Sequence, residues 1–365
     1  MIGSMEELKG LKKTYNAAYR FIDTNVKEGL GNKEAIVCGN ESLTYHEIAK
    51  RINQFGNALL DIGVEPENRI LLVTYDSPEF ITTFFGAIKI GAIPIPVNTM
   101  MKPHDYEYFL NHSRAKVLVV HEDIWEHLKD HQDRYLFLKH VIVISEGGNK
   151  STEYNDFHHF VNSASDQLTE EYYTTAEDIA FWLYSSGSTG NPKGVLHRQE
   201  SMEACYENYA RKILHMKKED KVFSASKLFF AYGLGNGLYF PFGAGATTIL
   251  LKERPTPERV FELIEREKPT IFFGVPTLYG AMLNYISETG RVPDLSSVRV
   301  CVSAGEPLPA SYFEKWKEIF HLNILDGIGS TEALHIYLSN RNDNIKAGST
   351  GKLVPGYKAK IVNEL

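Results

Sequence analysis

Residues 181–195 read Phe181-Trp-Leu-Tyr-Ser-Ser-Gly-Ser-Thr-Gly-Asn-Pro-Lys-Gly-Val195. An apolar run leads directly into residues rich in hydroxyl groups and glycine, which predicts a buried strand followed by a loop. Glycine lets the backbone turn its N–H groups inward around an anion, the hydroxyls add donors, and Lys193 adds a positive charge. The segment therefore predicts a cradle for the phosphates of a nucleotide.

This cradle differs from the P-loop pattern Gly-x-x-x-x-Gly-Lys-Ser/Thr. Two residues separate Gly190 from Lys193, and a glycine follows the lysine, so a P-loop NTPase is disfavoured. The plain structural alternative is a flexible Ser/Gly surface loop. Such a loop rarely follows a buried aromatic strand and ends in Pro-Lys-Gly, so we rank it below the phosphate cradle.

Short β-branched runs recur outward from this segment and predict buried strands. They lie at residues 70–73, 117–120, 141–144, 248–251, 271–273 and 298–302. Amphipathic stretches lie between them, such as residues 45–60, where Thr44 and Glu47 form the pattern of a capping box. Strands that alternate with helices predict an α/β fold of βαβ layers with mostly parallel sheets.

Residues 184–194 resemble the phosphate-binding signature of the adenylate-forming superfamily, which includes acyl-CoA ligases, adenylation domains and luciferases. A second block, Asp326-Gly-Ile-Gly-Ser-Thr-Glu332, resembles the Thr-Glu motif of the same superfamily. The resemblance implies that Thr331 contacts the α-phosphate of ATP, that Glu332 holds Mg²⁺, and that Lys193 neutralises phosphate charge. It also implies an ATP-binding set in the loop: Ser185, Ser186, Gly187, Ser188, Thr189 and Gly190.

A third block, Ser303-Ala-Gly-Glu-Pro-Leu308, resembles the turn of the superfamily that lies beside adenine. The resemblance implies that this turn and the segment at 326–329 enclose the base. The implied residues are Gly305, Glu306, Pro307, Asp326, Gly327 and Ile328. The alternative is an ordinary turn from strand to helix, in which Glu306 lies near a helix start that favours negative charge.

The aromatic segment at residues 226–237 is broken by glycines and resembles the benzoate–CoA ligase branch of the superfamily, as does Leu334-His-Ile-Tyr-Leu-Ser-Asn340. Phe230 stands where many fatty-acyl members carry histidine. The resemblance implies a slot for an aryl ring lined by Ala231, Tyr232, Gly327, His335 and Ile336. Ordinary core packing is the alternative for the aromatic residues, and His335 alone could be a core histidine.

The resemblance covers almost the whole chain and implies its division into domains. We expect an AMP-binding large domain at residues 1–340, made of two interleaved α/β subdomains, and the start of a β-rich subdomain at 341–365. We expect the small C-terminal lid domain of the superfamily to be absent from this chain. A fragment of a longer gene product is favoured over a short degenerate relative because the phosphate motifs are intact.

Bulk composition narrows the class of protein. The 365 residues are 43% hydrophobic and carry 46 acidic against 39 basic side chains, without a basic patch for nucleic acid. Three separated cysteines and the lack of a signal peptide or long apolar run predict a soluble cytoplasmic protein. We interpret the polar stretch at 145–175 as a surface excursion, and assign no metal to its adjacent His158 and His159.

These observations predict an AMP-forming acid–thiol ligase. It would convert benzoate and ATP to benzoyl-AMP and pyrophosphate, and in the complete protein would transfer the acyl group to CoA. The isolated chain should turn over poorly. Three alternatives stay open: a ligase for a substituted benzoate or other aryl acid, an adenylation module that serves a carrier protein, and an inactive ligand-binding module. A homodimer is also left open.

Overall fold

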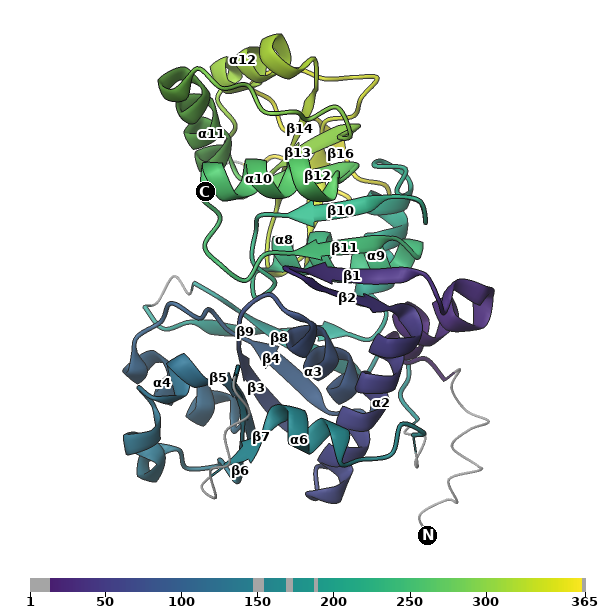
Figure 1. Cartoon of the computed structure of the whole chain (residues 1–365), viewed down its shortest axis with the longest axis vertical. Coiled ribbons are helices and arrows are strands. Elements are labelled where there is room, and N and C mark those ends of the chain that lie inside the picture. Colours follow the sequence, from purple (N-terminus) through teal and green to yellow (C-terminus); the bar gives the residue numbers. More distant parts are fainter. Residues whose placement is uncertain (1–13, 147–153, 169–172, 187–189, 363–365) are drawn as a thin grey trace. The chain divides into compact units, whose positions relative to one another are not determined.

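The computed structural model describes residues 14–146, 154–168, 173–186 and 190–362. The chain forms two compact units, Met1–Met202 and Glu203–Leu365 (Figure 1). Both mix helices with mostly parallel strands, which confirms the predicted α/β class. No helix in the described ranges is long and apolar enough to cross a lipid bilayer.

The first unit contains a five-stranded sheet in the order β4-β3-β5-β6-β7, with every neighbouring pair parallel. Its three longest strands are the predicted ones at 70–73, 117–120 and 141–144, because each is a β-branched run that is buried. The strands are β3 (Arg69–Val73), β4 (Ile93–Pro96), β5 (Val117–His121), β6 (His140–Ile144) and β7 (Asn155–Asp156).

Helices cover both faces of this sheet (Figure 1). Leu71 and Val73 of β3 pack with Phe109 of α4 (Pro103–Ser113) in one core, together with residues of α5 (Glu122–Trp125). The alternate residues of β3 point to the opposite face, on the side of α3 (Pro78–Lys89) and α2 (Tyr45–Asp61). Thr44 caps α2 in the predicted capping box, where its hydroxyl accepts from the Glu47 amide at 3.3 Å.

The remaining elements of the first unit are short. Two pairs of strands are antiparallel: β1 (Glu34–Cys38) with β2 (Glu41–Thr44), and β8 (Ile179–Ser185) with β9 (Lys193–Arg198). The short helical segments are η1 (Tyr19–Asp23), η2 (Val26–Leu30), η3 (Lys129–Arg134) and α6 (Phe157–Asn162). The helix α7 (Ser201–Cys205) spans the boundary between the units.

The prediction of a surface excursion at 145–175 is wrong for its central part. Phe157 and Phe160 of α6 are buried, and their rings lie 5.7 and 6.0 Å from the ring of Phe55 in α2. Their spacing of three residues places both rings on one helix face, which the surrounding polar residues concealed. His158 and His159 are exposed.

In the second unit, the strands follow the order β16-β15-β14-β13-β12-β10-β11. The five from β11 to β14 are parallel, and β15 and β16 add antiparallel pairs. The predicted strands at 248–251, 271–273 and 298–302 correspond to β11, β12 and β13. The bounds are β10 (Lys221–Ser224), β11 (Thr247–Leu250), β12 (Ile271–Gly274), β13 (Val300–Ser303), β14 (Ile324–Gly329), β15 (Ile336–Ser339) and β16 (Lys352–Leu353).

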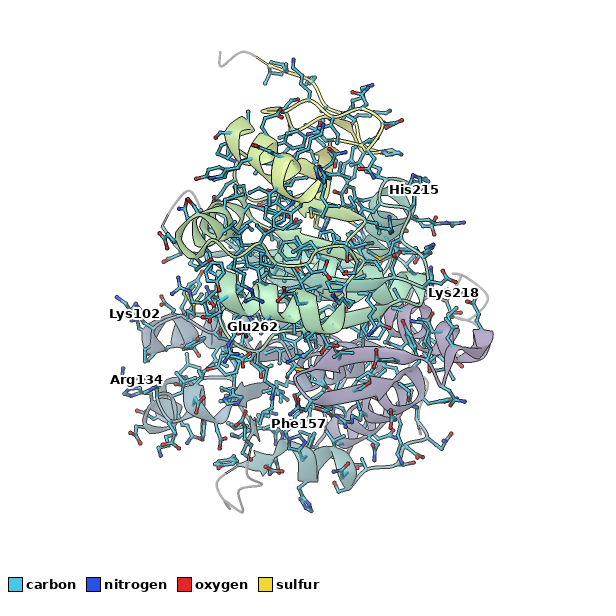
Figure 2. All side chains as sticks on the ribbon, turned by 45° about the horizontal axis from the view of Figure 1, so that its top comes forward. Lys102, Arg134, Phe157, His215, Lys218 and Glu262 are labelled. Atoms are coloured by element: carbon cyan, nitrogen blue, oxygen red, sulfur yellow. The ribbon has the colours of Figure 1, made fainter. Side chains whose placement is uncertain are left out.

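Amphipathic helices pack on this sheet. In α10 (Pro257–Glu267), Val260 and Ile264 are buried while Glu262 is exposed on the outer side (Figure 2). Tyr279 of α11 (Pro276–Thr289) meets Trp316 of α12 (Ala310–Phe320) edge to face at 4.9 Å. The shorter helices are η4 (Tyr206–Arg211), α8 (Ala231–Leu234), η5 (Gly235–Tyr239) and α9 (Phe240–Ala244).

A partly buried ion pair ties the start of β10 to the loops before β12 and β13. Asp220 accepts hydrogen bonds from Arg299 Nε and Nη2 at 3.0 and 2.8 Å and from the Thr270 hydroxyl at 2.7 Å. Burial alone would raise the pKa of Asp220, but hydrogen bonds from Arg299, Thr270 and the Lys217 amide together outweigh it and lower the pKa. The charged carboxylate is therefore the form that the fold stabilises.

Asp220→Asn should lower the free energy of unfolding by about 2–3 kcal/mol at pH 7. This loss is smaller than that for breaking a fully buried pair, because Arg299 keeps 34% of its side-chain surface exposed. A lowered folded-state pKa contributes stability that is complete above the unfolded pKa and is lost as pH falls through the folded value. The free energies of unfolding of variant and wild type, measured with urea, should therefore become equal at acid pH. Glu262→Gln, in an exposed pair with Arg259, is the control and should change little. A constant difference at all pH values would contradict the charge-based account.

Candidate active site

The predicted phosphate loop, residues 185–194, joins β8 to β9 as a hairpin. Ser185 pairs with Lys193 across the two strands, so the loop returns to the place where it leaves. Ser186, Gly190 and Lys193 are exposed. Gly190 has a φ of +99°, a conformation that residues with a side chain rarely adopt. The other predicted members of the loop lie outside the described residues: Gly187, Ser188 and Thr189.

In the second unit, the predicted adenine-side residues gather at the carboxyl ends of β13 and β14. Gly305, with a φ of +97°, and the exposed Glu306 and Pro307 follow β13. Gly327 and Ile328 belong to β14, as does Asp326, and the Ile328 side chain is 41% exposed. The carboxyl edge of a parallel sheet is where α/β proteins place their ligands.

The carboxyl edge also carries buried polar atoms. Gly274, Ser303 and Asp326 lie side by side, one from each of β12, β13 and β14. Burial raises the pKa of Asp326 to about 6, against hydrogen bonds from the backbone of Leu308 and Gly327 that lower it. Within the described residues, Asp326 Oδ1 and Ser303 Oγ are buried without a hydrogen-bond partner. These atoms can bind a ligand that supplies the missing partners.

Thr331 and Glu332 lie in the tight turn between β14 and β15. Thr331 is half-buried and Glu332 is exposed. The Leu334 amide donates to the Thr331 carbonyl oxygen at 3.0 Å. A side chain at Gly329 would meet the His335 carbonyl oxygen at 2.5 Å, so this position requires glycine. The turn presents an exposed carboxylate oxygen, a ligand type that suits Mg²⁺.

Four of the five predicted aryl-slot residues contact one another in pairs. The Tyr232 ring lies 5.6 Å from the His335 ring. A side chain at Gly327 would meet Ile336 Cγ2 at 3.0 Å, so the glycine allows the close approach of Ile336. Ala231 precedes Tyr232 in α8 and is half-buried.

His335 is buried among aromatic rings. Its ring lies 4.5 Å from Phe240 and 5.3 Å from Tyr209, in addition to Tyr232. Burial lowers the pKa of His335 to about 3, against a backbone hydrogen bond at Tyr232 that raises it. The imidazole is therefore uncharged at neutral pH. Its Nε2 lies 3.0 Å from Oδ1 of the buried Asn236.

Known proteins resemble the chain over nearly its full length. The AMP-binding enzyme family matches residues 23–365. The chain belongs to the AMP-binding enzyme family. The benzoate–CoA ligase of Thauera aromatica is 44% identical to it over 97% of this chain. The chain spans 66% of the length of that ligase.

Two solved structures support the family assignment. An anthranilate–CoA ligase in complex with anthranoyl-AMP superposes with a TM-score of 0.91 at 37% identity, covering 97% of this chain and 67% of that one. A benzoate–CoA ligase from Burkholderia xenovorans superposes with a TM-score of 0.83 at 39% identity, covering 94% of this chain and 67% of that one. This AMP-binding chain thus has the fold of aryl–CoA ligases.

Two residues of this AMP-binding chain that contact His335 were not predicted from the sequence. Asn236 bonds its imidazole, and a side chain at Gly235 would lie 2.4 Å from His335 Cδ2. Asn236 follows Tyr232 by four residues, which is one helical turn and places both on one face. The spacing relates Asn236 to Tyr232 only, and it does not point to His335, which is 99 residues away.

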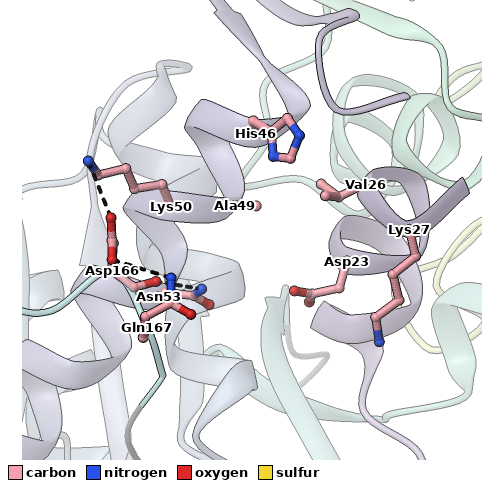
Figure 3. A pocket seen from close by; sticks show the side chains of 9 residues that line it. All are labelled: Asp23, Val26, Lys27, His46, Ala49, Lys50, Asn53, Asp166 and Gln167. Atoms are coloured by element: carbon pink, nitrogen blue, oxygen red, sulfur yellow. Dashed lines mark hydrogen bonds and ion pairs between the residues drawn. The ribbon is translucent and has the colours of Figure 1, made fainter. Parts of the chain in front are cut away.

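A cavity of about 360 Å³ in the first unit of this AMP-binding chain contains none of the predicted site residues. It lies between η1, η2 and α2, beside residues 166–167 (Figure 3). Lys50 pairs with Asp166 at its rim at 3.4 Å. Asp23 and Asn53 hold the buried ammonium of Lys89 at 2.8 and 2.6 Å. Its polar groups thus tie η1 and α2 to the end of α3.

Proposed function

We propose that the protein activates benzoate with ATP and transfers the benzoyl group to CoA. The observation that carries the choice of an aryl acid is the uncharged His335 imidazole among the rings of Tyr209, Tyr232 and Phe240. A pocket lined by planar, apolar side chains favours the binding of a flat, apolar ring such as that of benzoate. The 44% identity to a benzoate–CoA ligase supports benzoate as the first choice.

In the first step, a benzoate carboxylate oxygen attacks the α-phosphorus of ATP, and the bond to pyrophosphate breaks. Both reactants are anions, so the protein must offset their repulsion and hold them in line. Lys193 supplies a positive charge from an exposed position at the start of β9. Thr331 would donate to the α-phosphate. No side chain forms a covalent bond to the substrate.

The Thr331-Glu332 turn fits a magnesium–phosphate complex. Glu332 is exposed and offers a hard oxygen ligand. Mg²⁺ bound there would neutralise the charge that develops on the phosphates. We assign the base to the edge formed by Gly305, Glu306, Pro307 and the segment at 326–328. There the raised pKa of Asp326, about 6, makes its protonation sensitive to the ligand.

In the second step, the CoA sulfur attacks the acyl carbon, and AMP leaves. We propose that the chain corresponds to the large domain of its longer relatives, with residues beyond 340 entering a β-rich part, and that a small C-terminal domain completes this step. This proposal is supported by the comparison with the benzoate–CoA ligase of Thauera aromatica, because the chain spans 66% of the length of that ligase. All three cysteines are buried and none forms a disulfide, which favours a reducing cytoplasm.

The test is benzoate-dependent exchange of labelled pyrophosphate into ATP by the full-length protein, followed by a CoA thioester assay. Benzoate, aminobenzoate and hydroxybenzoates should be compared by kcat/KM. We expect benzoate to give the highest value. A higher value for a substituted acid would change the assigned substrate, and exchange without thioester formation would favour a carrier protein as acceptor. ATP binding without exchange for any acid would favour a binding module.

A further inference from the structure

Helix α4 contacts the backbone directly before Lys193. The Tyr108 hydroxyl donates a hydrogen bond to the carbonyl oxygen of Pro192 at 2.9 Å. This carbonyl belongs to the peptide group that joins Pro192 to Lys193. Because a peptide group is planar, fixing its oxygen also fixes the direction of the Lys193 N–Cα bond. The contact therefore acts on the backbone from which the Lys193 side chain departs.

A second contact from α4 holds the opposite strand. His112 lies one helical turn after Tyr108, and the two rings stack with their centroids 5.2 Å apart and an angle of 22° between their planes. The Nδ1 atom of His112 and the Tyr184 hydroxyl share a hydrogen bond of 2.8 Å. Tyr184 pairs with Gly194 across β8 and β9. One face of α4 thus contacts β8 and the residue directly before β9, at the two ends of the phosphate loop.

Three constraints converge on the backbone of Lys193. Its strand pairing with Ser185 sets its position. The ring of Pro192 fixes the φ angle of the residue directly before Lys193, and Tyr108 holds the orientation of the peptide group between Pro192 and Lys193. The Lys193 side chain itself is exposed. A lysine side chain has four rotatable bonds and loses substantial entropy when it binds an anion. When the backbone of Lys193 is held in place, fewer side-chain conformations are lost as the lysine binds a phosphate, so the entropic cost of binding is smaller.

We propose that Tyr108 is a positioning residue for Lys193, and that His112 holds the Tyr108 ring in place. The inference rests on the proposed role of Lys193 toward ATP. It assigns to α4 a part in nucleotide binding, although α4 precedes the phosphate loop by more than seventy residues in the sequence. Its effect should fall on ATP, because the contact acts on the lysine and the aryl acid has no part in it.

The test compares Tyr108→Phe with Tyr135→Phe in the full-length protein. Both remove a tyrosine hydroxyl that donates to a main-chain oxygen, since Tyr135 bonds the Leu128 carbonyl at 3.0 Å. Phenylalanine at 108 keeps the ring that stacks on His112. We expect Tyr108→Phe to weaken ATP binding and raise the KM for ATP about 2- to 10-fold, the value of one hydrogen bond. The KM for benzoate should stay constant, and Tyr135→Phe should change neither.

A double-mutant cycle separates positioning from general packing. If Tyr108 acts through Lys193, Tyr108→Phe should cause no further loss of ATP affinity in a Lys193→Ala background. An equal loss in both backgrounds, or equal rises in the KM of ATP and acid, would overturn the proposal. Calorimetric ATP affinity serves as a second measurement. If the wild type binds ATP without exchanging pyrophosphate, the proposed function fails, while the affinities still decide the role of Tyr108.

Discussion

Lys193→Ala is expected to lower benzoate-dependent pyrophosphate exchange by about 100- to 1,000-fold, the usual loss when a fixed electrostatic stabiliser of a transition state is removed. The side chain is exposed and its backbone pairs with Ser185. The fold should therefore tolerate the change, and the loss should appear both as a lower kcat and as a higher KM for ATP. Initial rates of exchange in the full-length protein, measured over a range of ATP concentrations, provide the check.

The control for this variant is Lys129→Ala. Lys129 is also in the first unit and pairs with Glu126 on the surface at 2.6 Å, so its removal should leave exchange and thermal stability nearly unchanged. Glu332→Gln should lower exchange independently, with a loss that excess Mg²⁺ partly reverses. Wild-type exchange rates in Lys193→Ala would refute the role assigned to the phosphate loop.

Gly235→Ala is expected to raise the KM for benzoate by about 10- to 100-fold, the range for overpacking a closely packed site. The new methyl group would lie 2.4 Å from His335 Cδ2 and 2.8 Å from the Tyr239 hydroxyl. The His335 ring cannot move freely, because Asn236 bonds its Nε2 and the Phe240 ring packs against it at 4.5 Å. The aryl slot should therefore deform while ATP affinity is kept.

Gly237→Ala is the matched control, two residues further along η5. A methyl group there would lie 3.0 Å from the end of the flexible Leu228 side chain and 3.7 Å from Ser224 Cβ, which is an ordinary contact, so the KM for benzoate should change by less than about 3-fold. Acid kinetics and ATP calorimetry on both variants separate slot damage from unfolding. Equal effects of the two substitutions would show that His335 does not shape the acid site.

The strands could be predicted because their signal is local. The runs at 70–73, 117–120 and 141–144 are β-branched and buried on both faces, so composition alone marks them. The capping box of α2 depends on two residues three apart, and was equally visible. By contrast, α6 has only a few apolar residues in a polar stretch, and its burial depends on Phe55, about a hundred residues earlier.

The site could be predicted as a set of motifs and not as a set of contacts. The loop composition and the resemblance predicted Lys193 and His335 as site residues, but gave no indication that Tyr108 or Asn236 touches their surroundings. Those contacts join residues 84 and 99 positions apart, and no spacing rule reaches that far. Only the fold determines which distant side chains meet.

The aligned residues Gly274, Ser303 and Asp326 have a consequence for how such a site can change. One residue earlier on the same strands, Phe273, Val302 and Leu325 are fully buried and hold the sheet together. A single step of about 3.3 Å along the strands thus separates an apolar row that holds the sheet together from a row in which Ser303 and Asp326 carry buried polar atoms. Design can change the ligand preference at these two side chains while the apolar row behind them preserves the fold, but Gly274 has to stay, because a methyl group there would lie 2.9 Å from the Tyr279 ring.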